Sequence, residues 1–165
     1  MSVTLILLPI ALAAAAAAGG IGVLGATVTA TAADKNSGAA PEIRVRTRMK
    51  DSTLLADALT NLGATAVEVS RTRVTAEVDR AALTMTLTED AVWEAHVEGL
   101  GRREVTVLGA TELLQRLDGE YALMVQHAVA EKIRQRAESS GFDLVSETRE
   151  ADDTVTMVLN VHAQA

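Results

Sequence analysis

Cysteine is absent from this chain of 165 residues, which excludes disulfides, thiolate metal sites and cysteine nucleophiles. Aromatic residues make up only 2% of it: Trp93, Tyr121 and Phe142. A folded domain must therefore build its core from aliphatic side chains, and it has few rings on which single-stranded nucleic acid could stack. The formal net charge of −7 also disfavours a phosphate backbone as ligand. We expect no nucleic acid among the partners.

Charged side chains are missing from residues 2–33. This apolar run is long enough to cross a bilayer, since about 20 helical residues span about 30 Å. Pro9 suits a first helical turn, where its missing N–H is not needed, so a span from Pro9 to Thr29 is predicted. We expect residues 1–33 to be a membrane-anchor helix, with membrane lipid as one partner.

Two other interpretations of the run stay open. It could be a cleaved signal peptide, because Ala30, Thr31 and Ala32 form a small-residue cleavage pattern, and the domain would then be secreted. It could also be a flexible low-complexity tail, because alanine is only weakly membrane-seeking. Against cleavage, no Lys or Arg precedes the run.

The charges that flank the run predict its orientation. Cationic side chains follow it and none precedes it: Lys35, Arg44, Arg46, Arg48 and Lys50 come after the span. Because Lys and Arg stay on the cytoplasmic side of a membrane, we expect a single-pass protein whose domain is cytoplasmic.

Small residues inside the run admit two interpretations. Residues 20–25 match G-x-G-x-x-G, but no strand–helix context supports a dinucleotide site. Ala18, Gly22 and Ala26 recur every four residues, a spacing that lets helices pack closely in lipid. The alternative is a low-complexity stretch without a partner.

Residues 34–41 are a polar linker that ends at Pro41, and residues 42–165 form the domain. Period-two alternation predicts strands at residues 43–49, 66–70, 73–79, 83–87 and 93–97, with the last two forming a hairpin. Asp51 or Ser52 can cap a helix that Gly63 ends. A helical stripe predicts a long helix over residues 111–139, which Gly119 could divide, and two strands close the chain at residues 142–146 and 155–161.

This order predicts an α+β domain with the sequence β-α-β-β-β-β-α-β-β, an antiparallel-rich sheet and helices on one face. Two stretches carry a resemblance. EIRVRTRMKDSTLLADALTNLG joins a strand, an aspartate and a Leu-Leu helix, and the chain from Leu113 to Val161 joins a Tyr-Ala helix to Gly-Phe-Asp-Leu-Val. The domain resembles the hypothetical chloroplast open reading frame 35 family, a domain of unknown function also found in bacteria. The resemblance implies no established activity and an association with AAA-type ATPases; the membrane segment is an addition to the family pattern.

Candidate sites are few. Arg44, Arg46, Arg48 and Lys50 could meet lipid headgroups or a partner below the anchor, or pair across strands with acidic residues of the sheet, namely Glu68, Glu77, Glu94 and Glu98. His96 and Glu98 share a strand face and could ligate a metal, but solvated side chains are the simpler interpretation. His127 and Gln126 are interpreted as surface residues. Trp93 and Tyr121 are expected in the core.

No catalytic, cofactor-binding or metal site is therefore predicted, and no cofactor. The expected function is a membrane-tethered, non-enzymatic binding or scaffolding module, a subunit or adaptor of a larger assembly that self-associates or meets an AAA-type ATPase. The alternative is a small-ligand or enzymatic domain with a pocket between sheet and long helix, where Glu94, His96, Glu98 and nearby arginines would supply the polar groups.

Overall fold

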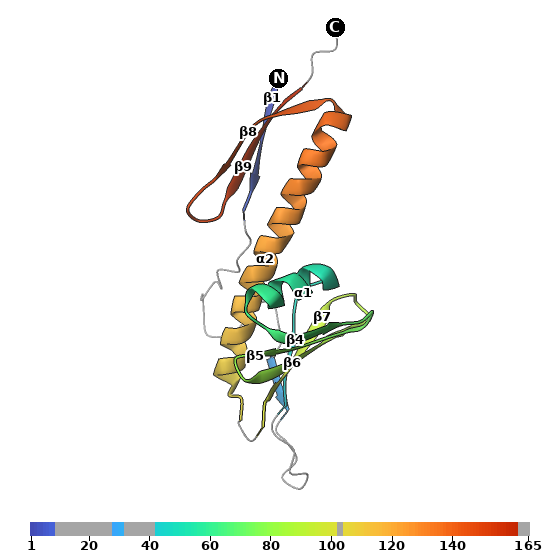
Figure 1. The fold of residues 1–165 in the computed structure, drawn as a ribbon, viewed down its shortest axis with the longest axis vertical. Helices are drawn as coiled ribbons and strands as arrows, with labels where there is room; N and C mark the ends of the chain where they lie inside the picture. The colour runs from blue at the N-terminus through green and yellow to red at the C-terminus, as the bar shows by residue number, and fades with distance from the viewer. Residues whose placement is uncertain (9–27, 32–41, 102–103, 162–165) are drawn as a thin grey trace. The chain divides into compact units, whose positions relative to one another are not determined.

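The computed structural model describes residues 1–8, 28–31, 42–101 and 104–161. The chain divides into two units: residues 1–11 with 122–165, here called the terminal unit, and residues 12–121, here called the central unit. The long helix α2 (Val107–Ala137) begins in the central unit and ends in the terminal unit (Figure 1). Each unit is described by itself.

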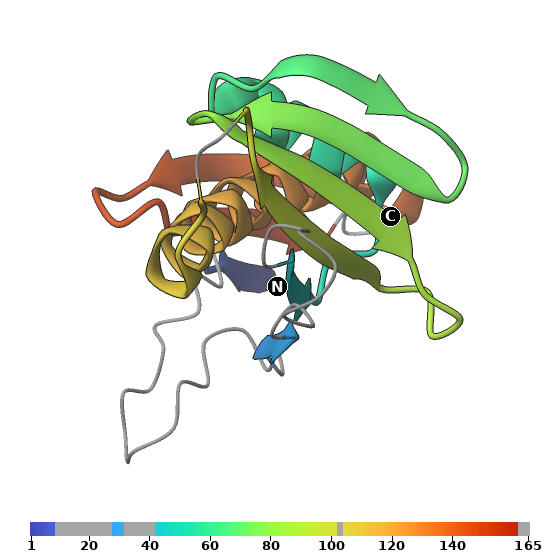
Figure 2. The ribbon, with the colours of Figure 1, turned by 90° about the horizontal axis from the view of Figure 1, so that it is seen from below.

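An antiparallel six-stranded sheet forms the central unit, in the order β2-β3-β7-β6-β5-β4. Figure 2 shows the twist of the sheet in strands β4 to β7, drawn in green. The strands are β2 (Val28–Thr31), β3 (Glu42–Arg46), β4 (Thr65–Val69), β5 (Arg73–Val78), β6 (Ala81–Leu87) and β7 (Trp93–Gly99). Helix α1 (Ser52–Asn61) contacts β4 and β5.

Helix α1 has the ends that its sequence predicts. The Asp51 carboxylate accepts hydrogen bonds from the main-chain N–H of Thr53 at 2.8 Å and of Leu54 at 3.1 Å, which satisfies donors that no helical carbonyl reaches. At the other end Gly63 has a φ of +78°, the left-handed conformation that glycine adopts after a helix. The buried face of α1 consists of Leu55, Ala58 and Leu59.

Alternation along β5, β6 and β7 builds the core of the central unit. On these strands every second residue is buried: Val74, Ala76, Val78, Ala81, Leu83, Met85, Trp93, Ala95 and Val97. Burial also alternates along residues 43–49, although β3 itself ends at Arg46. The first half of α2 contributes buried side chains at helical spacing, namely Ala110, Leu113, Leu114, Leu117 and Tyr121.

Trp93 and Tyr121 form hydrogen bonds with the main chain that connects β3 to α1. The hydroxyl oxygen of Tyr121 accepts hydrogen bonds from the main-chain N–H of Lys50 at 3.1 Å and of Asp51 at 3.0 Å. The indole Nε1–H of Trp93 donates to the Lys50 carbonyl at 3.3 Å. Both rings are buried, so the prediction that they lie in the core is confirmed.

The terminal unit holds a three-stranded antiparallel sheet in the order β1-β9-β8, with β9 in the middle. Its strands are β1 (Ser2–Leu7), β8 (Phe142–Arg149) and β9 (Val155–Val161), and a short 3-10 turn, η1 (Glu138–Ser140), follows α2. Ala130, Val155 and Met157 form a buried cluster against which Leu5, Leu7 and Ile133 pack.

The α+β class and the antiparallel pairing are confirmed, but several details differ from the prediction. The strands of the described residues form two sheets rather than one. Helix α2 begins at Val107, earlier than Thr111, and continues through Gly119 without a break. Gln126, interpreted as a surface residue, is buried, whereas its neighbour His127 is exposed.

Within the apolar run, the described residues Ser2–Leu7 and Val28–Thr31 are strands. The rest of the predicted anchor, including Ala18, Gly22 and Ala26, lies outside the described residues. In the described part of the chain no helix has the length and hydropathy needed to cross a membrane.

Candidate functional site

A hollow of about 670 Å³ lies in the central unit, beside the first turns of α2. Its buried lining is apolar and comes from the sheet and the helix: Ala81, Val97 and Leu113. Polar side chains complete the lining, among them Asp79, Glu104, Thr106, Glu112, Gln115 and Arg116. The hollow therefore has a small apolar floor and a largely polar rim.

Two tight backbone features place these side chains. Asp79 and Arg80 form the two-residue turn between β5 and β6, with φ angles of 50° and 68°, as the mirror-image turns of short hairpins require. Thr106 precedes α2, and its hydroxyl oxygen accepts from the main-chain N–H of Gly109 at 3.1 Å, as a helix N-cap does. The hairpin tip and the helix start therefore carry the polar rim.

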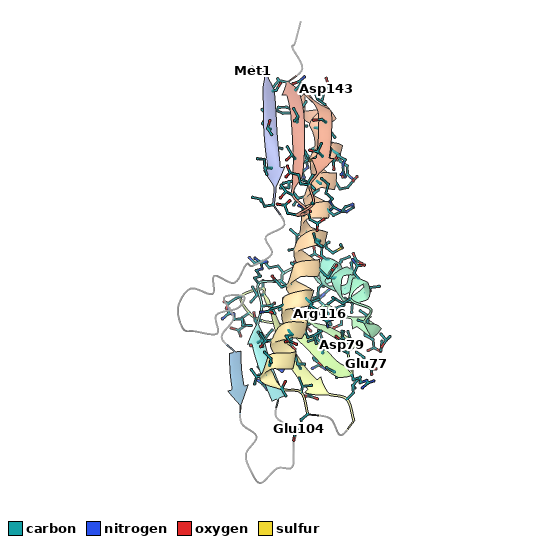
Figure 3. All side chains as sticks on the ribbon, turned by 90° about the vertical axis from the view of Figure 1, so that its left-hand side faces the viewer. Met1, Glu77, Asp79, Glu104, Arg116 and Asp143 are labelled. Atoms are coloured by element: carbon teal, nitrogen blue, oxygen red, sulfur yellow. The ribbon has the colours of Figure 1, made fainter. Side chains whose placement is uncertain are left out.

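Charge at the rim is mainly negative. Arg116 forms an ion pair with Asp79, and Figure 3 shows the two side chains close together, with Glu104 further along the same end of the unit. Glu104 and Glu112 are both exposed, and three carboxylates thus face one guanidinium among the described lining residues. Arg102 and Arg103, which precede Glu104 in the sequence, lie outside the described residues.

Two exposed apolar side chains lie in the first turn of α2. Val107 is 39% exposed and Leu108 is 69% exposed, between the lining residues Thr106 and Gly109.

The four predicted contact residues do not form one stripe. Arg44 lies opposite His96 in the pairing of β3 with β7, and Arg46 lies opposite Glu94 while its guanidinium pairs with Asp90. Among the described residues, Glu94 is the one acidic residue proposed as a cross-strand partner that lies opposite one of these arginines in the pairing of β3 with β7.

Arg48 and Lys50 lie beyond the end of β3. Two guanidinium nitrogens of Arg48 donate to the two carboxylate oxygens of Asp118 in α2, at 2.9 and 2.7 Å. The Asp118 side chain is 3% exposed. Lys50 is held through its main chain by Tyr121 and Trp93. The sequence indicates that Asp118 has a partner. Asp118 falls on the apolar stripe of the helix with Leu114 and Tyr121, where a buried carboxylate needs a partner.

Glu94, His96 and Glu98 occupy the alternate positions of β7 to the buried Trp93, Ala95 and Val97. The Nε2 atom of His96 lies 3.2 Å from a carboxylate oxygen of Glu94. None of the three lines the hollow, so the pocket between sheet and helix has a different set of polar groups from the one predicted. Among the described residues there is no group of three or more His, Asp or Glu side chains able to hold a metal ion.

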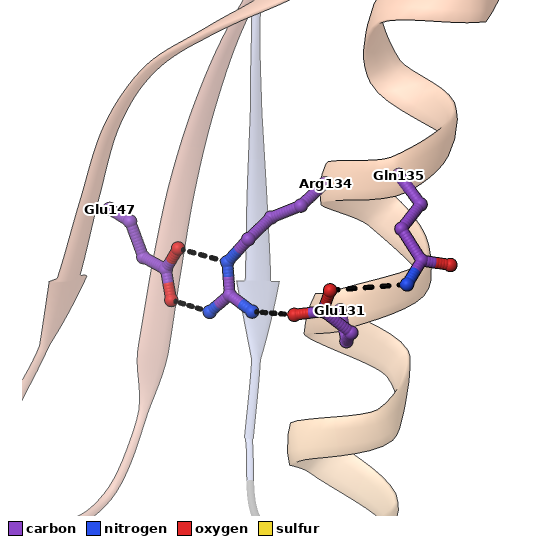
Figure 4. A network of polar contacts seen from close by, with 4 residues as sticks. All are labelled: Glu131, Arg134, Gln135 and Glu147. Atoms are coloured by element: carbon purple, nitrogen blue, oxygen red, sulfur yellow. Dashed lines mark hydrogen bonds and ion pairs between the residues drawn. The ribbon is translucent and has the colours of Figure 1, made fainter.

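A separate polar network stabilises the terminal unit (Figure 4). Arg134 in α2 donates to both carboxylate oxygens of Glu147 in β8, at 2.8 and 2.5 Å, and to Glu131 at 2.7 Å. These hydrogen bonds hold the pKa of Glu147 below its usual range, because they favour the ionised carboxylate. The pKa of Arg134 is raised by the same bonds. Both groups are charged at neutral pH, and their role is to tie β8 to the helix.

No protein-family model, curated protein or solved structure matches the chain.

Proposed function

We propose that the chain is a non-enzymatic binding module, a subunit or adaptor of a larger assembly, and that the hollow beside α2 receives a segment of a partner protein. The single observation that carries this proposal is the hollow itself, with its buried apolar lining of Ala81, Val97 and Leu113. Leu108, in the same first turn of α2 as the lining residue Gly109, is an exposed apolar side chain. A partner side chain placed there would remove apolar surface on both molecules from water.

The rim indicates the chemistry of the partner segment. Arg116 is already paired with Asp79, which leaves the negative charges of Glu104 and Glu112 for a partner. The favoured segment therefore presents one apolar side chain flanked by Lys or Arg. Rim charges of this kind contribute to association rate and selectivity more than to affinity.

We also propose that residues 9–27 tether this module to a membrane. The support is the uncharged run and the cationic residues that follow it. The resemblance to the chloroplast open reading frame 35 domain supports an assembly in which the partner is a second copy or an AAA-type ATPase.

The test is chemical cross-linking in native membranes followed by purification of the full chain. One variant, Leu108→Ser with Glu112→Arg, removes an exposed apolar group and reverses a rim charge. A matched variant, Val69→Ser with Glu68→Arg, makes the same two changes on β4, where both side chains are also exposed.

The proposal expects a defined cross-linked protein with the parent chain and with the β4 variant, and its loss with the hollow variant. The recovered partner should carry a basic segment with an apolar residue. Equal cross-linking by both variants would place the contact elsewhere, and recovery of only the lone chain from membranes would refute a binding module.

A further inference from the structure

The hollow beside α2 is continuous with a second, smaller one. This second hollow has a volume of about 400 Å³ and shares the lining residues Asp79, Glu104 and Val105 with the first, while Arg80 of the β5–β6 turn completes its lining. Two carboxylates therefore border both hollows, whereas the buried apolar floor belongs to the first alone. One depression thus joins an apolar region to a region lined by carboxylates.

Small residues leave the apolar floor open. Ala81 begins β6 and lies opposite Gly99 of β7, and Gly109 of α2 also lines the hollow. None of the described lining residues is aromatic. The floor therefore suits an aliphatic stem, and it lacks the ring faces that attract guanidinium and quaternary ammonium groups.

Negative charge exceeds positive charge among the described lining residues. Asp79 is paired with the Arg116 guanidinium, which leaves the carboxylates of Glu104 and Glu112, both exposed. The described residues contain no group of three or more His, Asp or Glu side chains that could hold a metal ion. An organic cation therefore complements this lining better than a metal ion does.

We propose that the hollow receives an unmodified lysine of the partner segment, with its aliphatic stem along the floor and its ammonium group held by Glu104 and Glu112. This inference rests on the binding function proposed above and narrows the cationic residue of the segment to lysine. Lysine carries a compact charge with three N–H donors on a flexible four-carbon stem. Arginine is favoured where its planar group stacks on a ring, which the described lining does not offer.

The volume of the hollow admits this lysine together with the apolar side chain of the same segment. At about 670 Å³ the hollow lies within the range of pockets that enclose ligands larger than one side chain. The lysine stem and the apolar side chain then cover the floor together, and the charged end stays at the exposed carboxylates, where long cationic side chains usually keep their charge.

Capped single amino acids test the proposal without the partner. The probes are the acetylated, methylamidated forms of lysine, norleucine, arginine and Nε-trimethyllysine, and norleucine keeps the four-carbon stem without the charge. Saturation-transfer difference NMR, observed on the probe, measures the Kd for the purified full chain. Probes of about 14 heavy atoms are expected to bind with a Kd of about 1 mM.

We expect the lysine probe to bind about fivefold more tightly than the norleucine probe, because two exposed carboxylates each contribute modestly. Arginine and trimethyllysine should bind more weakly than lysine. The variant Glu104→Gln/Glu112→Gln should lose the preference for lysine and keep its affinity for norleucine. The matched control, Glu68→Gln/Glu77→Gln, makes the same change of charge at exposed positions outside the hollow and should keep the preference.

The other outcomes refute the inference at separate points. Equal binding of lysine and norleucine would show that the carboxylates do not hold the ammonium group, and equal binding of arginine would refute the selectivity for lysine. Loss of the preference in the control variant would assign it to the net charge of the chain. If no probe binds, the hollow does not take a lysine, while the cross-linked partner would still support a binding module; a lysine preference without any cross-linked partner would refute the module alone.

Discussion

Replacement of Arg48 by methionine is the sharpest test of how the central unit is held together. The Asp118 carboxylate, 3% exposed, receives two hydrogen bonds from the Arg48 guanidinium, whose side chain is 33% exposed. Arg48→Met keeps the stem of the side chain and leaves the carboxylate buried without this partner. Loss of one member of a buried pair costs about 3–5 kcal/mol, and access of water along the half-buried arginine side favours the lower end of that range.

Two further variants, the Asp118→Leu single change and the double change, complete a double-mutant cycle. Asp118→Leu costs less, about 1–2 kcal/mol, because the Arg48 side chain is 33% exposed and keeps access to water when its hydrogen bonds to Asp118 are lost. The double variant Arg48→Met/Asp118→Leu is expected within about 1 kcal/mol of the parent, since an apolar pair of similar size removes both charges. The coupling free energy is then at least about 3 kcal/mol.

Urea unfolding followed by Trp93 fluorescence measures these differences. Trp93 is the only tryptophan, is 1% exposed and belongs to the central unit, so its emission reports on that unit. The reasoning would be refuted if Arg48→Met cost less than about 1 kcal/mol, or if the double variant were as unstable as the sum of the single changes.

Three further predictions use the other local features. Arg80→Gly should stabilise the central unit by about 1 kcal/mol in the same assay, because Arg80 has a φ of 68° in a turn that favours glycine; a destabilised variant would contradict this. Gln126→Leu should accelerate amide hydrogen exchange in β1 by about fivefold, since the hydrogen bond to the Leu7 carbonyl is worth about 1 kcal/mol; unchanged exchange would show that Gln126 does not hold the strand. The pKa of Glu147 is lowered by Arg134, so the pair stabilises the terminal unit above about pH 4.5 and this contribution is lost as the pH falls through the lowered pKa; Glu147→Gln should flatten the acid dependence of exchange in β8, and an unchanged profile would contradict it.

The elements that the sequence predicts correctly have local causes. Helix α1 carries its own cap in Asp51 and its own stop in Gly63, and the hairpins of β5, β6 and β7 alternate buried and exposed side chains residue by residue. Such patterns depend on neighbours in the chain, so a single sequence suffices to find them.

The features that were missed depend on partners far away in the chain. Asp118 and Gln126 both lie on the buried side of α2, and each is satisfied by residues from another element: Asp118 by Arg48, and Gln126 by the main chain at Leu7 and Asp153. A polar residue within an apolar stripe indicates that a partner exists, but the stripe does not identify it. The polar groups of the hollow were missed for the same reason, since the β5–β6 turn and the start of α2 meet only in the folded unit.

The apolar run shows most clearly why composition and strand pairing have to be weighed together. Its uncharged residues meet the length requirement of a membrane helix, while Val3, Leu5 and Leu7 recur at period two opposite Leu159, Met157 and Val155, which is the pattern of a strand. The same residues therefore satisfy the length of a membrane helix and the alternation of a strand. Only the distant strand β9 and the side chain of Gln126 favour the strand, and neither can be read from the run itself. For residues 2–7 the pairing with β9 decides between the two patterns, because it is a contact with a strand more than 140 residues away that no window of the run contains.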